Sequence, residues 1–179
     1  MRIISGFYKG RRIDLPKSIQ LRPTTDMAKE SLFNVLRNHI DFDEIDALDL
    51  FSGTGSISYE LISRGVKSVL AVEQNGQQIR FIESIISKLE MENIRVLRMD
   101  VFQFIKASKR SFDLIFADPP YDLPNLESLI DAIFIKKLLS PNGIFVLEHS
   151  KQFSFSNHSA FYEHRNYGSV NFSFFKNPV

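Results

Sequence analysis

The sequence contains no cysteine and no tryptophan, and only 8 of its 179 residues are glycine. The absence of cysteine excludes disulfide bonds, thiolate metal sites and a cysteine nucleophile. No apolar run approaches the roughly 20 residues that are needed to span a membrane, and MRIISGFYKGRR lacks the apolar stretch of a signal peptide. The four histidines are scattered, so we expect no metal site. These features predict a cytoplasmic protein without a membrane segment, and we expect a monomer.

The net charge of +1 hides an uneven distribution of charge. Residues 1–37 hold eight basic side chains against three acidic ones, whereas the remainder of the chain is slightly acidic. A basic segment attached to a nearly neutral core is typical of a protein that binds a polyanion. A solvated basic surface arm is the alternative.

From Ile45 onwards, apolar strands alternate with amphipathic helices. We expect five strands at Ala47–Phe51, Val69–Glu73, Ile94–Met99, Leu114–Ala117 and Ile144–Glu148, with helices ending at Arg64 and spanning Gln77–Leu89 and Leu126–Leu139, the last followed by a turn at 140–143. Two closing strands, Phe161–Arg165 and Ser169–Phe175, have no helix between them. This order predicts an α/β fold: a doubly wound, mostly parallel seven-stranded Rossmann-like sheet with an antiparallel edge.

The N-terminal segment has a different pattern. Two short β-like stretches, Arg2–Ser5 and Arg11–Leu15, are separated by glycines and suggest a hairpin. A helix is expected from Thr25 or Asp26 to about Asn38. We therefore divide the chain into a hairpin extension (residues 1–24) and a main domain (residues 25–179).

A glycine-rich turn follows the first strand of the main domain. It reads Asp49-Leu50-Phe51-Ser52-Gly53-Thr54-Gly55, and its glycines allow a backbone to approach a ligand closely. The third glycine of a dinucleotide fingerprint is absent, since Ser58 stands there. The turn alone is therefore equally compatible with a structural loop.

Carboxylates end the next two strands. Glu73 lies 20 residues after Gly53, the spacing at which an acidic residue accepts hydrogen bonds from ribose hydroxyls. Asp100 either accepts from an adenine amino group or caps the following helix. Together with Asp49, these residues predict an acidic pocket, which suits the positive sulfonium and ammonium groups of S-adenosylmethionine better than the phosphates of NAD.

The most specific pattern is Asp118-Pro119-Pro120-Tyr121, directly after the fourth strand. Two prolines stiffen the loop and leave carbonyl oxygens free to face a ligand. A carboxylate and a proline carbonyl that accept the two hydrogens of an exocyclic base amine would make its nitrogen lone pair available, and Tyr121 would stack on the base. Such catalysis works by positioning and electrostatics, without a covalent intermediate. An ordinary strand-exit turn is the alternative.

These residues resemble the bacterial 16S ribosomal RNA guanine-N2 methyltransferase family, a class I S-adenosylmethionine-dependent group. The similarity extends over nearly the whole chain, and the segments most typical of the family are Lys9-Gly10-Arg11 and Leu21-Arg22-Pro23-Thr24-Thr25-Asp26. The resemblance implies methylation of guanine N2 in small-subunit rRNA, within an assembled particle, and the position-966 guanine if the chain is orthologous. The departures are Ser58 in place of a glycine, and Met27 and Lys29 in place of arginines.

The resemblance implies that the cofactor site is lined by Phe51, Gly53, Gly55, Glu73 and Asp100 and that the guanine is held by Asp118 and Tyr121. Our full expected sites are a catalytic loop of Asp118, Pro119, Pro120 and Tyr121 and a cofactor site of Asp49, Phe51, Gly53, Thr54, Gly55, Glu73, Asp100 and Val101. RNA contacts are expected from Tyr8, Lys9, Arg11, Arg12, Arg22 and Lys29. Tyr8 is equally compatible with a buried aromatic of the hairpin.

Two other functions stay open at this point. One is an amino-methyltransferase that acts on adenine N6 or on a protein glutamine; the other is a non-catalytic RNA-binding module. A base-modifying enzyme must take its target out of the stack, which is easier in RNA loops.

Overall fold

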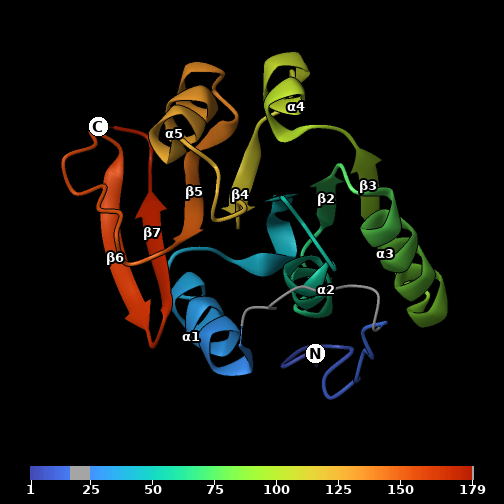
Figure 1. Ribbon diagram of the computed structural model, residues 1–179. Coiled ribbons are helices and arrows are strands. Elements are labelled where there is room, and N and C mark those ends of the chain that lie inside the picture. Colours follow the sequence, from blue (N-terminus) through green and yellow to red (C-terminus); the bar gives the residue numbers. More distant parts are fainter. Residues whose placement is uncertain (17–24, 179) are drawn as a thin grey trace.

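Seven strands form one sheet in the computed structural model, which describes residues 1–16 and 25–178 (Figure 1). The strands are β1 (Asp46–Leu50), β2 (Ser68–Glu73), β3 (Ile94–Arg98), β4 (Phe112–Ala117), β5 (Leu139–His149), β6 (Phe161–Tyr167) and β7 (Val170–Phe175). Their order is β3-β2-β1-β4-β5-β7-β6. β1 to β5 are parallel, and β7 runs antiparallel to both β5 and β6. The predicted doubly wound α/β sheet with an antiparallel edge is confirmed.

Within the described part of the chain there are five α-helices and one 3-10 helix: α1 (Asp26–Leu36), η1 (Phe42–Glu44), α2 (Ser56–Ser63), α3 (Gly76–Leu89), α4 (Val101–Ala107) and α5 (Leu126–Ile135). α1 and η1 precede the first strand, and the other four helices connect successive parallel strands. Side-chain caps begin several of them: the Thr25 hydroxyl accepts from the amide of Ala28, and the Asn75 side chain accepts from the amides of Gln77 and Gln78. Such caps satisfy amides that have no partner within the helix.

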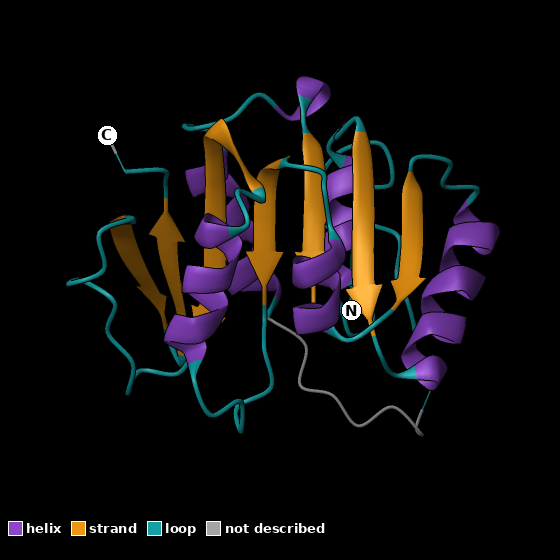
Figure 2. Cartoon of the chain, turned by 90° about the horizontal axis from the view of Figure 1, so that it is seen from above, coloured by secondary structure: helices purple, strands orange, loops and turns teal. Residues whose placement is uncertain are grey.

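The sheet is buried on both faces because its strand residues alternate between two hydrophobic clusters. Ala47 and Val69 pack with α1, α2 and α3, whereas Leu48 and Val72 pack with α4 and α5. Figure 1 shows the two groups of helices on opposite sides of the sheet, and Figure 2 shows the row of strands from above. Near-continuous apolar strands are therefore required in this fold.

The register places the ends of β1, β2 and β4 together. Leu50, the last residue of β1, pairs with Val72 in β2 and with Ala117 in β4. The segments after these three strands therefore leave the sheet at one edge, as expected for a parallel sheet with its ligand site at the carboxyl ends.

The connection between α5 and β5 differs from the prediction. We expected a helix to Leu139 and a turn at 140–143, but α5 ends at Ile135, and β5 starts at Leu139 and includes those four residues. Lys137 has a φ of 53° beyond the helix end, and the β4–β5 register shifts between Phe112 and Leu114. Residues 140–143, which we expected to form a turn, are therefore the irregular start of β5, and pairing with β4 keeps them in the sheet.

Residues 1–16, which we name the N-terminal arm, form less strand than expected. Instead of two strands there is one isolated bridge, between Arg2 and Arg12. The side chains of Ile3 and Ile13 are buried in the cluster that contains α1, α2 and α3. Packing against the main domain, more than strand pairing, therefore holds the arm.

Candidate active site

A cavity of about 560 Å³ opens at the sheet edge where β1, β2, β3 and β4 end. Its volume is typical of small-molecule sites. It is lined by Asp49, Phe51, Ser52, Gly53, Thr54, Ser56, Ile57, Glu73, Gln74, Asn75, Gln78, Met99, Asp100, Val101, Phe116, Asp118, Pro119, Pro120 and Tyr121. All the predicted cofactor residues except Gly55 line it, and so does the whole catalytic loop.

Gly55 is the N-cap of α2 and lies between Thr54 and Ser56, which line the cavity. Its φ is +79°, and a Cβ there would lie 2.7 Å from Cζ of the Tyr59 ring. Phe51 also has a positive φ, 56°, which is uncommon for a non-glycine residue and concentrates at functional sites. The loop is therefore held in a conformation that the sequence pattern alone did not reveal.

Asp49 is a buried carboxyl group at the floor of the cavity. Its Oδ2 accepts a hydrogen bond from the Ser58 hydroxyl at 2.5 Å. Burial raises the pKa of Asp49 to about 7, although Ser58 opposes the shift and the charges of Asp118 and Glu73 add to it. Ser58, which we regarded as a departure from the glycine pattern, thus supports a carboxylate of the site.

Glu73 connects the end of β2 to the glycine loop. One of its carboxylate oxygens accepts from the amide of Gly53 at 2.9 Å, and the other accepts from the amides of Gln74 and Asn75, each at 2.8 Å. Three backbone donors hold the carboxylate at the cavity wall. Asp100 also lines the cavity, and its Oδ1 caps α4 by accepting from the amide of Gln103 at 3.0 Å.

The loop Asp118–Tyr121 forms the wall opposite Glu73. Burial raises the pKa of Asp118 to about 7, whereas the side chain of Tyr121 is 78% exposed. The carbonyl of Pro120 accepts from the amide of Leu123 at 2.9 Å. Of the two proline carbonyls, that of Pro119 is therefore the one we assign to a ligand.

A narrow second cleft lies on the other side of this loop. It shares Asp118, Pro119, Pro120 and Tyr121 with the large cavity and adds Leu123, Leu126, Glu148, His149, Ser150 and Phe153. The four-residue loop therefore separates the large cavity from a crevice of about 10 Å³, which has room for about one water molecule.

The charge of the large cavity selects the kind of ligand. Four carboxyl groups line it, and none of its lining residues is a lysine or an arginine. Phosphate groups would meet no compensating positive side chain here, whereas a cationic nucleoside derivative would meet negatively charged carboxylates. The lining residues fit S-adenosylmethionine.

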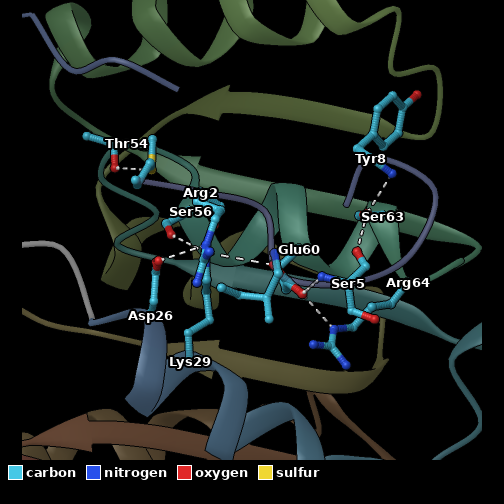
Figure 3. A network of polar contacts seen from close by, with 12 residues as sticks. Arg2, Ser5, Tyr8, Asp26, Lys29, Thr54, Ser56, Glu60, Ser63 and Arg64 are labelled. Atoms are coloured by element: carbon cyan, nitrogen blue, oxygen red, sulfur yellow. Dashed lines mark hydrogen bonds and ion pairs between the residues drawn. The ribbon is translucent and has the colours of Figure 1, made fainter. Parts of the chain in front are cut away.

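The N-terminal arm is attached to α2 by a buried polar network (Figure 3). The carboxylate of Glu60 accepts from the amides of Ile4 and Ser5, at 2.7 and 3.0 Å, and from Nε of Arg64 at 2.8 Å. The carbonyl of Ser63 accepts from the amide of Phe7, and a Cβ on Gly6 would lie 1.6 Å from that oxygen. The arm therefore approaches α2 as closely as backbone contacts allow.

Lys29 belongs to this network, and our prediction that it contacts RNA is wrong. Its side chain is 2% exposed; Nζ donates to the carbonyl of Arg2 at 2.7 Å and to the hydroxyl of Ser56 at 3.2 Å, and lies 3.8 Å from Oε2 of Glu60. An ammonium with these partners cannot reach a phosphate. Burial lowers the pKa of Lys29 despite the nearby Glu60.

The other predicted RNA contacts lie on the surface of the arm, except for Arg22, which falls outside the described residues. Lys9, Arg11 and Arg12 are exposed, and Tyr8 is half-buried. Phe7, which the sequence reasoning missed, is 88% exposed, and its ring meets that of Tyr8 edge to face. An exposed aromatic beside basic residues is the only signal that would have singled it out.

No helix in the described part of the chain is long and apolar enough to cross a membrane. No group of three acidic, histidine or cysteine side chains there is placed to hold a metal ion.

Comparison with known proteins places the chain among methyltransferases. The model of a family described as "Conserved hypothetical protein 95" matches residues 1–176. The chain is 34% identical over 148 residues to the ribosomal RNA small subunit methyltransferase D of Buchnera aphidicola, covering 83% of this chain and 75% of that protein. It is 35% identical to a putative rRNA methyltransferase, YlbH, of Bacillus subtilis, covering 85% and 84%.

The fold has close matches among solved structures. A putative methyltransferase of Escherichia coli, yhhF, superposes with a TM-score of 0.87 at 24% identity, covering 99% of this chain and 98% of that one. This likeness supports the Rossmann-like assignment of the fold.

Proposed function

The chain belongs to the ribosomal RNA small subunit methyltransferase D family, and from this premise we propose that it is an RNA methyltransferase that acts on small-subunit rRNA. We further propose that the donor is S-adenosylmethionine and that the acceptor is the exocyclic N2 of a guanine, at position 966 of the 16S rRNA if the chain is orthologous to its named relatives.

The observation that carries the proposal is the place of the Asp118–Tyr121 loop. It lines the acidic cavity, and Tyr121 at its end is 78% exposed. A methyl donor in the cavity and a base stacked on Tyr121 would meet at this loop. Proximity of two reactants at a rigid loop is a large part of what a transferase must supply.

The lining residues suggest how the donor is held. Glu73, at the end of β2, suits the ribose hydroxyls, and Asp100 with Val101 suits the adenine. The methionine portion would be surrounded by Asp49, Phe51, Gly53 and Thr54, and Gly55 would support the turn that carries them. When bound, S-adenosylmethionine supplies a methyl group activated by a positively charged sulfur.

The catalytic loop would bind and orient the acceptor amine. Asp118 and the Pro119 carbonyl accept the two amine hydrogens, which makes the nitrogen lone pair available, and Tyr121 stacks on the ring. When the new N–C bond forms, the amine must lose one proton. A carboxyl group whose pKa burial raises to about 7 is a suitable acceptor for that proton near neutral pH.

The exposed arm would approach the RNA. Lys9, Arg11 and Arg12 provide positive charge, and Phe7 and Tyr8 provide stacking surfaces. We propose that they grip the rRNA beside the flipped guanine in an assembled particle, with the protein acting as a monomer in the cytoplasm.

The test is a transfer assay with labelled S-adenosylmethionine and undermodified small ribosomal subunits, naked rRNA and DNA in parallel. We expect label in subunits, and N2-methylguanosine when the labelled nucleoside is identified by mass. Labelled adenine, or label only in protein, would instead support another amino-methyltransferase. An absence of label in all three substrates would contradict the proposal.

Two variants assign the role of the loop. Asp118→Ala should lower transfer by about 100-fold or more while the affinity for S-adenosylmethionine changes little. Asp122→Ala, an exposed carboxylate just beyond the loop, is the matched control and should transfer normally. Wild-type turnover in Asp118→Ala would refute the assigned role.

A further inference from the structure

Two arginines, which we name the arginine pair, lie together at the edge of the large cavity. A Cβ on Gly76 would lie 3.5 Å from Nη1 of Arg80 and 3.6 Å from Nη1 of Arg98, so both guanidinium groups lie beside one point. Gly76 directly follows Asn75, and Arg98 directly precedes Met99. Asn75 and Met99 line the cavity, whereas the two arginines do not. The arginine pair therefore adjoins the acidic site from outside.

The charge of the arginine pair is not compensated within the described part of the chain. Both residues are exposed, and neither forms an ion pair or a hydrogen bond with another described residue. By contrast, Arg64 and Arg165 are each paired with a glutamate. Two positive charges beside one point repel each other, and an anion between them removes that cost. The arrangement therefore suits a negatively charged partner from outside the chain.

The start of α3 does not by itself provide a site for an anion. Asn75 caps this helix, and its side chain already accepts from the amides of Gln77 and Gln78. A guanidinium group presents several N–H donors in one plane, which match the oxygens of a phosphate group. The donors that remain for an anion here are those of Arg80 and Arg98.

The arginine pair lies on the same side of the sheet as the N-terminal arm. Ile3 and Ile13 of the arm pack in one cluster with Ile82 of α3. The hydroxyl of Tyr8 donates to the carbonyl of Glu90, the C-cap of α3, at 3.5 Å. Figure 1 shows the arm beside α2 and α3. A polyanion bound along the arm can therefore continue beside α3 to the edge of the cavity.

We propose that Arg80 and Arg98 bind a backbone phosphate of the rRNA close to the target base. The inference rests on the proposed function, which supplies the RNA, and adds a contact outside the arm. Arg98 pairs in the β2–β3 register with Glu73, which lies across the cavity from the Asp118–Tyr121 loop. The RNA is thus held on both sides of the methyl donor. Such phosphate contacts position a nucleic acid without reading its sequence.

The test is methyl transfer to undermodified small ribosomal subunits by Arg80→Gln/Arg98→Gln over a range of salt concentrations. The KM for subunits should rise roughly 10-fold with kcat unchanged, because the lost contact is equally strong in the ground and transition states. The KM should also depend less steeply on salt, since binding releases fewer counterions.

Lys106→Gln/Lys109→Gln is the matched control. It also removes two exposed positive charges, from the last turn of α4 and the loop after it, and α4 packs on the other side of the sheet. This variant should keep the wild-type KM and salt dependence. An equal change in both double variants would reflect net charge alone and would overturn the inference.

Three other results would contradict the inference. They are an unchanged KM in the arginine variant, a fall in kcat alone, and weaker binding of S-adenosylmethionine without a change in the KM for subunits. The last would assign the arginines to the donor site. Circular dichroism checks the fold, and if the double variant does not fold, Arg80→Gln and Arg98→Gln are judged singly by the same criteria.

Equilibrium binding to protein-free small-subunit rRNA identifies the partner and separates the two proposals. The wild-type protein should bind more tightly than the arginine variant, since phosphate contacts act on any RNA. A defect confined to assembled subunits would indicate a ribosomal protein as the partner and refute the phosphate contact. If the wild-type protein labels no guanine but the difference in binding persists, the proposed function alone fails.

Discussion

The buried carboxyl group beneath the N-terminal arm and the two at the cavity have opposite surroundings. Beneath the N-terminal arm, Glu60 receives two backbone amides and the charges of Arg64 and Lys29. At the cavity, Asp49 has the Ser58 hydroxyl as its side-chain partner, and burial raises the pKa values of Asp49 and Asp118 to about 7. Removing a carboxylate that is fully paired inside the protein is strongly destabilising, because its partners are left without compensation. One that is buried with few partners costs stability, and its charge is available for a cationic ligand and for proton transfer.

The largest effect is expected from Glu60→Ala. The variant leaves the amides of Ile4 and Ser5 without their acceptor and the buried ammonium of Lys29 without its counter-charge, which should cost about 3–5 kcal/mol of unfolding free energy. The melting temperature should fall by roughly 10 °C, as measured by calorimetry. Glu127→Ala, on the exposed face of α5, should stay close to the wild type. A similarly small loss in Glu60→Ala would remove the distinction between the two groups.

A pH series should show the cost of the cavity carboxylates. In the folded protein Asp49 and Asp118 keep their protons up to about pH 7, whereas in the unfolded chain they lose them near 3.8. The folded state therefore binds more protons between these values, so the stability that these groups contribute is lost as pH rises from about 4 through 7. We expect the melting temperature of the free protein to fall by several degrees from pH 5 to pH 8.

The double variant Asp49→Asn/Asp118→Asn isolates that trend. Burial lowers the pKa of His149, which acts in the opposite direction, so the difference between wild type and double variant is the quantity to measure. That difference should grow with pH. If the two melting curves stay parallel from pH 5 to pH 8, the cavity carboxylates do not titrate as described.

Asp49→Asn should raise the free energy of unfolding, whereas Glu60→Ala should lower it. The amide can still accept from Ser58 and is not penalised for a buried charge, so at pH 8 we expect about 1–2 kcal/mol of added stability. The gain should shrink at pH 5, where the wild-type carboxyl is protonated. Titration calorimetry should show S-adenosylmethionine binding weakened by roughly tenfold. Destabilisation with unchanged binding would place Asp49 in the structural group.

The smallest effect is expected from Ser58→Ala. It removes the side-chain hydrogen bond that opposes the pKa shift of Asp49, and should cost about 1 kcal/mol at pH 8. Chemical denaturation of Ser58→Ala measures the loss, and Ser111→Ala, which replaces an exposed serine, is the control. A larger loss at pH 5 than at pH 8 would contradict the dependence on an ionised Asp49.

Much of the cavity was predictable because its residues follow strands. Gly53, Glu73 and Asp118 each come directly after an apolar run, and parallel strands bring such ends together. The adjacent lining residues, such as Met99 and Phe116, were missed because nothing in their type marks them. Glu148 was read only as the end of a strand, and its proximity to Asp118 depends on the β4–β5 register.

The arm was the least predictable region. A basic, glycine-punctuated segment indicates a surface hairpin that binds RNA, and for Lys9, Arg11 and Arg12 an exposed position agrees with this expectation. Lys29 has the same side-chain chemistry but points inward, since Glu60 lies across from it on another helix. Burial of a lysine depends on a partner 31 positions away, which local patterns do not contain.

The sequence by itself determined the order of strands and helices, the doubly wound sheet and the acidic edge, because hydrophobic periodicity and strand-end residues are local properties. The tertiary structure alone decided which charges are paired and which are left for a ligand. Pairing depends on which helices and strand ends meet, and only the packed chain brings Glu60 to Lys29 and Glu148 to Asp118.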